Sequence, residues 1–229
     1  MKYYDVTKKK SGITVKLKVP VVGEQIQPAT VKVLQNTAAI RVFHWILVAS
    51  LTTALLTGLQ VSFAEPLFLT MRTLRLIHMS GGFVAFAAVL YRIGYAFITG
   101  DYRNFSINFQ DLKTFPHLIR YYLFLEKRPP KLRTKYNVGQ KFVFFSWIIC
   151  TFYLTFAGIL LYNSYFSQSA YNFHFLQKML PPVYNRLLKY YVTIYMLSTI
   201  MLHIYLAHTE DIAKSHSIFT GWIKVKKPR

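Results

Sequence analysis

Three histidines lie within or at the edges of long apolar segments. His44 is in the sequence RVFHW, His78 in RLIHMSGG and His203 in MLHIYLAH. An ionisable side chain in an apolar membrane span costs a few kcal/mol unless it is paired, so its presence there indicates a function. Neutral imidazole is also the usual axial ligand of haem iron, with its second ring nitrogen bonded to a nearby acceptor. These three residues are therefore predicted to bind haem b.

Four apolar segments must position these histidines: residues 42–63, 76–99, 142–162 and 190–207. A helix needs about 20 apolar residues to cross a bilayer. With 53% hydrophobic residues and a mean hydropathy of +0.28, the chain is predicted to be an all-α integral membrane protein, a haem-binding bundle of four transmembrane helices. A fifth apolar stretch, 118–125, is too short to span and is predicted as a helix in the membrane interface.

Lys and Arg residues are unevenly distributed among the segments that flank and connect these apolar runs. Eight Lys and Arg lie in residues 1–41, nine in 99–141 and five after residue 207, against two in 64–75 and three in 163–189. Because cytoplasmic loops carry the excess of Lys and Arg, both termini are predicted to be cytoplasmic in a multi-pass inner-membrane protein. The net charge of +20 therefore reflects topology, and nucleic-acid binding is not expected.

The chain outside the helices carries less information. Residues 1–36 are predicted to form a cytoplasmic tail, whose alternating stretch ITVKLKV is either a short strand or a solvated segment; we favour the latter. Residues 37–229 are predicted to form the four-helix cytochrome b domain. The single cysteine, Cys150, provides no thiolate site, so any iron–sulfur cluster must lie in other subunits.

Two haem levels are expected from the positions of the ligands. His44 near the start of the first helix and His203 near the end of the fourth fall at similar depth on the inner side, where they can clamp one haem. Alternatively, each is a packed histidine that bonds a neighbouring helix.

His78 lies on the outer side, and the sequence leaves several alternatives for the second ligand of a haem there. Fourteen residues before His203, about 21 Å along the helix, is Lys189 rather than a histidine. The alternatives are Lys189 as a nitrogen ligand, His174 from the outer loop, a five-coordinate haem, or no outer haem.

Several separated segments together resemble the cytochrome b subunit of membrane-bound nickel–iron uptake hydrogenases: RVFHW, RLIHMSGG, YRIGYAFITGDYRNF, YYLFLEKRP and HIYLAHTEDI. The resemblance covers residues 40–221. It implies two b haems, one on His44 and His203 and one on His78 and a histidine at the position of Lys189, where this sequence departs from the pattern. It also implies association with iron–sulfur and catalytic subunits of a hydrogenase-type complex.

The segment KYNVGQK resembles the gamma subunit of respiratory formate dehydrogenase more closely. That resemblance implies a quinone site at Asn137, Gly139 and Gln140. The chemistry agrees, since amide side chains donate hydrogen bonds to a quinone carbonyl and glycine permits close approach. The competing interpretation is a polar cap on the third membrane helix.

The expected function is electron relay. A partner enzyme outside the membrane oxidises its substrate, H2 in this prediction, and electrons pass through haem to a quinone in the bilayer, with protons entering through His208, Glu210 or Asp211. The chain itself does not cleave the substrate. The alternatives are the same role for a formate dehydrogenase or a sulfur-compound oxidoreductase, or a haem-free membrane anchor.

Overall fold

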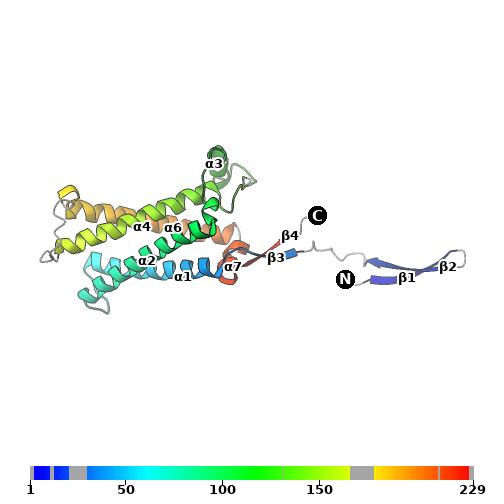
Figure 1. The fold of residues 1–229 in the computed structure, drawn as a ribbon, viewed down its shortest axis with the longest axis horizontal. Coiled ribbons are helices and arrows are strands. Elements are labelled where there is room, and N and C mark those ends of the chain that lie inside the picture. The colour runs from blue at the N-terminus through cyan, green and yellow to red at the C-terminus, as the bar shows by residue number, and fades with distance from the viewer. Residues whose placement is uncertain are drawn as a thin grey trace.

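Four long helices form the body of the protein (Figure 1). The computed structural model describes residues 3–10, 13–20, 30–130, 132–165, 178–210 and 212–226. The helices are α1 (Ala38–Phe63), α2 (Met71–Thr99), α4 (Val138–Tyr165) and α6 (Pro182–Thr209), and each is long and apolar enough to cross a membrane. The predicted four-helix membrane bundle is confirmed. Each helix runs several residues beyond its apolar run, because polar residues at the ends still satisfy the helical hydrogen-bond pattern.

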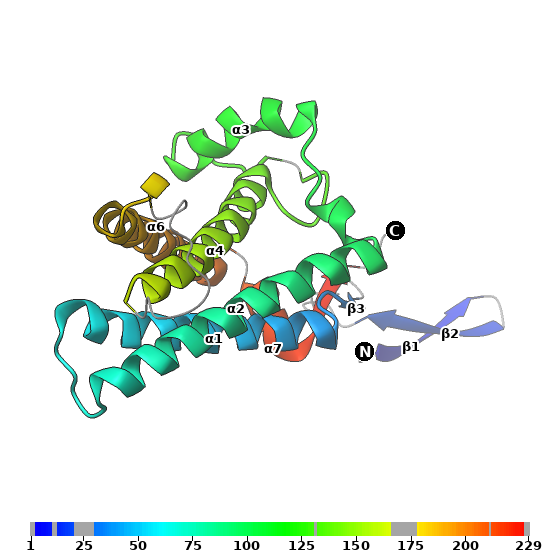
Figure 2. The same cartoon turned by 60° about the vertical axis from the view of Figure 1, so that its left-hand side comes forward.

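The bundle consists of two helix pairs. α1 packs on α2 and α4 packs on α6, while α2 also contacts α4, as Figures 1 and 2 show. Gly81 of α2 lies against the backbone of α1 at Ser50. Between α2 and α4, Phe86 and Phe152 meet edge to face with ring centroids 4.9 Å apart. Because most of the helical surface faces outward, the body is suited to a lipid environment.

Polar side chains join α4 to α6 at several depths. Trp147 Nε1 donates to Thr199 Oγ1 at 2.8 Å. Nearer the other end, the buried Asn185 Nδ2 donates to the carbonyl oxygen of Ala157 at 3.2 Å, and Tyr153 OH donates to Asn185 Oδ1. Such bonds between helices compensate for the absence of a hydrophobic driving force within a bilayer.

A shorter helix, α3 (Phe109–Tyr122), crosses the end of α4 at a steep angle (Figure 2). The prediction of a short helix was correct, but α3 begins nine residues before the predicted 118 and ends before 125. The early start has a local cause, a capping box in which Asn108 and Asp111 exchange side-chain-to-backbone hydrogen bonds. A short 3-10 helix, η1 (Asp101–Asn104), links α2 to this region and contains Asp101, which pairs with Arg92.

A buried ionic cluster fixes α3 to the start of α4. Lys141 is fully buried, and its Nζ donates to Asp111 Oδ2 and to the carbonyl oxygen of Ser106, both at 2.9 Å. Arg133 donates to the same carboxylate at 3.0 Å. Hydrogen bonds from Arg133, and then from Lys141 and the Asn108 backbone, lower the pKa of Asp111 to about 2. This cluster sets the position of the whole loop between α2 and α4.

Both ends of the described chain form strands. β1 (Tyr3–Lys10) and β2 (Ile13–Pro20) pair as one antiparallel hairpin, so the preference for a solvated tail was wrong; the alternating pattern does form strands. β3 (Thr30–Leu34) pairs with β4 (Trp222–Lys226), which follows α7 (Ile212–Thr220). The start of α1 and the segment after α6 therefore lie at the same end of the bundle, as the charge pattern predicted (Figure 1).

Replacing Asp111 by Asn should destabilise the protein by about 3 kcal/mol, because Lys141 would remain buried without its counterion. The pKa of Asp111 lies below the ordinary 3.8, so its contribution is present above pH about 4 and is lost as the pH falls towards 2. Thermal unfolding in detergent at a series of pH values measures both effects. Asp111→Asn should lose stability at pH 7 and lose part of the acid dependence; unchanged unfolding would contradict this role.

Candidate functional site

His44 and His203 lie at matching depths on two antiparallel helices. His44 is six residues after Ala38, where α1 begins, and His203 is six residues before Thr209, where α6 ends. Six residues correspond to about 9 Å along a helix. The two imidazoles are half-buried. The structure thus places the predicted inner pair at one depth on helices of the two different helix pairs.

Aromatic side chains of α4 enclose His203. The ring of Trp147 meets the imidazole edge to face, with centroids 5.5 Å apart and an interplanar angle of 85°. Phe144 lies 6.4 Å away at 70°. The hydrogen bond from Trp147 to Thr199, one helical turn before His203, holds this wall in place.

This donor set fits haem. Among the described residues there is no group of three or more His, Cys, Asp or Glu that could hold a bare metal ion. Haem needs only one or two protein ligands, because the macrocycle supplies the other four nitrogens. Two imidazoles at equal depth in apolar helices, with an aromatic wall beside one of them, meet that need.

At the other end of the bundle, His78 bridges three helices. Its Nδ1 donates to the carbonyl oxygen of Ala54 on α1 at 2.8 Å, which leaves the Nε2 lone pair facing Lys189 Nζ on α6 at 3.4 Å. The ring packs onto Gly58: a Cβ there would be 2.8 Å from His78 Cε1. The structure therefore brings Lys189 to His78, whereas His174 lies outside the described residues.

The predicted quinone residues form the start of α4. Asn137 Oδ1 accepts from the Gln140 backbone N–H at 2.8 Å, and Gln140 Oε1 accepts from the Asn137 backbone N–H at 3.0 Å. These two bonds form the polar helix cap that the sequence offered as the alternative to a quinone site. The cap uses Oδ1 of Asn137 and Oε1 of Gln140. Gly139 packs against Leu118 of α3, where a Cβ would lie 3.2 Å from Cδ2. The quinone assignment is untested by these contacts.

A hydrogen-bond chain connects this cap to the end of α6. Asn137 Nδ2 donates to Tyr122 OH at 3.3 Å, and Tyr122 OH donates to Glu210 Oε2 at 3.2 Å. Burial, together with the Glu210 charge, raises the pKa of Tyr122 to about 12, so the phenol stays protonated. Two other residues were predicted to take part in proton entry. His208 donates from Nδ1 to the carbonyl oxygen of Ile204 on its own helix. Asp211 lies outside the described residues.

Three residues of these sites were not predicted from the sequence: Gly58, Trp147 and Tyr122. Gly58 is fourteen residues after His44, and Lys189 is fourteen residues before His203. This shared spacing could have indicated from the sequence that Gly58 lies at the level of Lys189. Trp147 and Tyr122 are aromatic residues among many, and no sequence pattern distinguishes them.

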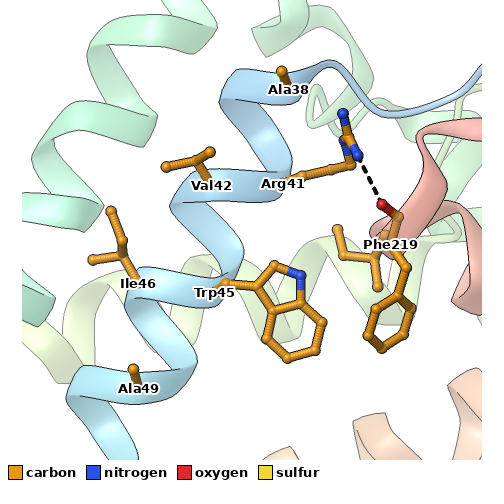
Figure 3. A pocket seen from close by; sticks show the side chains of 8 residues that line it. Ala38, Arg41, Val42, Trp45, Ile46, Ala49 and Phe219 are labelled. Carbon is orange, nitrogen blue, oxygen red and sulfur yellow. Dashed lines mark hydrogen bonds between the residues drawn. The ribbon is translucent and has the colours of Figure 1, made fainter.

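A separate apolar groove of about 510 Å³ lies on α1 beside α7 (Figure 3). Trp45 and Phe219 form its walls, and Arg41 Nη1 donates to the Phe219 carbonyl at 2.7 Å at one end. His44 is not among the lining residues and lies on another face of the helix. The groove is therefore distinct from the histidine pair.

The fold and the paired histidines define a multi-pass membrane protein of the cytochrome b class. Residues 36–221 match the prokaryotic cytochrome b561 family, and the chain belongs to that family. Two curated relatives are each named a probable Ni/Fe-hydrogenase B-type cytochrome subunit, one from Azotobacter chroococcum mcd 1 and one from Azotobacter vinelandii. Each is 24% identical over 217 residues, covering 84% of this chain and 88% of the relative. The resemblance seen in the sequence is confirmed, and a b-type cytochrome carries haem b.

Replacing Gly58 by Ala should displace the His78 ring and weaken its bond to Ala54, because the added Cβ would lie 2.8 Å from Cε1. Overpacking of this kind costs about 1–3 kcal/mol. Thermal unfolding in detergent measures the loss. Gly82→Ala is the matched control, since a Cβ at Gly82 has nothing within 4 Å. Equal stability of the two variants would contradict the close contact.

Proposed function

We propose that this chain is the membrane cytochrome b subunit of a hydrogen:quinone oxidoreductase, relaying electrons from an extracytoplasmic hydrogenase to the quinone pool. The single observation that carries the proposal is the pair His44 and His203, which lie at one depth on helices α1 and α6. Haem bound between these imidazoles would supply one-electron transfer. The names of the two Azotobacter relatives support the hydrogenase as partner.

Composition and topology also support a role in which this chain carries electrons and partner subunits carry the catalytic centres. A single cysteine cannot hold an iron–sulfur cluster, so the iron–sulfur and catalytic centres belong to partner subunits. The excess of Lys and Arg at the end where β3 and β4 pair supports a cytoplasmic location for that end in the inner membrane. The end with His78 and Lys189 would then face the hydrogenase.

The inner end would bind the quinone near Asn137, Gly139 and Gln140. A packed series of aromatic rings runs from His203 through Trp147 and Phe144 to Tyr136, the neighbour of Asn137; the last two rings have centroids 5.2 Å apart. Asn137 Nδ2 can exchange its bond to Tyr122 for one to a quinone carbonyl without loss of the helix cap, which uses Oδ1.

Proton supply to that position would use Glu210 and Tyr122. The Tyr122 hydroxyl donates to Glu210 and accepts from Asn137 Nδ2. For transfer, a protonated Glu210 would give its proton to the Tyr122 oxygen while the hydroxyl turns and gives its own proton to the reduced quinone, so the phenol stays neutral. Burial also raises the pKa of Tyr136 to about 12, with the Asp101 charge acting in the same direction, which keeps this second phenol protonated beside the cap.

Replacing His44 or His203 by Ala should remove the inner haem and lower the haem content per chain. Haem quantification and a reduced-minus-oxidised spectrum of the purified protein measure this. His117→Ala is the control, because His117 pairs with Glu126 in the loop and lies outside the membrane helices. The absence of b-type absorption in the unmodified protein would reject the cytochrome function and favour a haem-free anchor.

Tyr122→Phe should slow quinone reduction by about 100-fold, the lower end of the contribution of a positioned proton donor, while leaving haem content unchanged. The substitution removes only the hydroxyl that joins Glu210 to Asn137. Single-turnover reoxidation of reduced protein by a quinone analogue is the measurement, with Tyr121→Phe as the control. If both variants react at the rate of the unmodified protein, the proton chain through Tyr122 is wrong.

A further inference from the structure

The groove on α1 beside α7 has apolar walls and a cation at one end. Its α1 wall is one face of the helix, which carries Val42, Trp45 and Ala49 at spacings of three and four residues. Across the groove, the ring of Phe219 meets that of Trp45 with centroids 4.9 Å apart. Figure 3 shows Arg41 at one end of the groove and Ala49 at the other. The volume of about 510 Å³ is within the range of small-molecule sites.

The groove extends from the headgroup level of the membrane into its apolar region. Arg41 is the only Lys, Arg, Asp or Glu in α1, and the apolar run of this helix begins at the next residue. A basic residue at such a boundary lies among the lipid headgroups. Val42, Trp45 and Phe219 are exposed, so the walls of the groove are open to lipid.

The guanidinium of Arg41 has donors that the protein does not use. Its Nη1 donates to the Phe219 carbonyl at 2.7 Å, whereas Nε is buried without a hydrogen-bond partner among the described residues. None of the ion pairs in the described part of the chain includes Arg41. Because arginine offers parallel N–H donors that match phosphate oxygens, an anionic headgroup suits this end of the groove.

The ribbon of β3 and β4 adds positive charge at the same end. A Cβ at Gly221 would lie 3.5 Å from Arg41 Nε, so β4 begins beside the guanidinium. In the ribbon, Lys32 and Lys224 stand directly opposite one another, and both are exposed. Like charges in that arrangement destabilise a pair of strands, whereas clustered basic residues beside a membrane helix attract anionic lipid. The charge therefore favours an anionic lipid over a neutral quinone or an apolar helix of a partner.

We propose that this groove binds an anionic phospholipid of the leaflet at the β3–β4 end of the bundle. The phosphate would accept hydrogen bonds from Arg41, and one acyl chain would lie along Val42, Trp45 and Ala49 against Phe219. Such a lipid would join the start of α1 to α7. The inference concerns a site distinct from the histidines, so it depends neither on haem nor on quinone reduction.

The test measures lipid binding to the full chain in detergent by native mass spectrometry. Phosphatidylglycerol and phosphatidylcholine with identical acyl chains are titrated separately, so that only the headgroup differs. The unmodified chain should bind its first phosphatidylglycerol about 5-fold more tightly, roughly the contribution of one basic residue beside an anionic lipid. Arg41→Gln should remove this preference. Arg103→Gln is the matched control and should keep it, because Arg103 is exposed just after α2 and does not line the groove.

Ala49→Trp fills the apolar part of the groove without changing the charge, and it should also abolish the preference. This variant decides the question if Arg41→Gln does not fold. Equal affinity of the unmodified chain for the two headgroups, or a preference that either groove variant leaves intact, would overturn the inference. Displacement of phosphatidylglycerol by an uncharged quinone analogue would overturn it in favour of a quinone. Loss of lipid binding in the assembled complex would overturn it in favour of a helix from a partner subunit.

Discussion

An ionisable nitrogen inside an apolar helix must find a partner on another helix, and much of this bundle is arranged around that constraint. His44 and His203 lie at one depth on α1 and α6, and His78 of α2 bonds Ala54 of α1 and Lys189 of α6. Because water cannot satisfy these groups within a bilayer, each must be paired within the protein or by a cofactor. Glycine at 58 and the aromatic wall of α4 follow from the same need, since the imidazoles require both space and fixed orientation.

At the end of the bundle where β3 pairs with β4, polar contacts fix the connections between the helices. The Asp111 cluster joins α3 to α4, Lys135 reaches the chain before α1, and Asn36 Nδ2 donates to Ser217 Oγ in α7 at 2.9 Å. The pairing of β3 with β4 closes this end by joining segments from the two ends of the chain. The Tyr122 hydrogen bonds lie within this framework, so the region proposed for quinone and proton exchange is joined to both α4 and the end of α6.

The start of α4 contains the two residues for which the sequence left two interpretations. Asn137 and Gln140 were interpreted as quinone donors or as a helix cap, and they do form the cap. The cap engages their side-chain oxygens and not their amide N–H groups, of which Asn137 Nδ2 donates to Tyr122, so the cap and the proposed quinone bond use different atoms. Gly139 packs on Leu118 and thereby helps to hold α3 against α4.

The sequence by itself determined the four membrane helices, because apolar runs of about 20 residues have few alternatives to spanning. It also determined that His44 and His203 lie at matching depth, since depth follows from residue number along a straight helix. Only the tertiary structure decided which nitrogen faces His78, because the partner is set by how α2 packs on α1 and α4 and how α4 in turn holds α6. Likewise, the link from Glu210 through Tyr122 to Asn137 joins residues 88 and 15 positions apart, and such contacts depend on helix packing rather than on any local pattern.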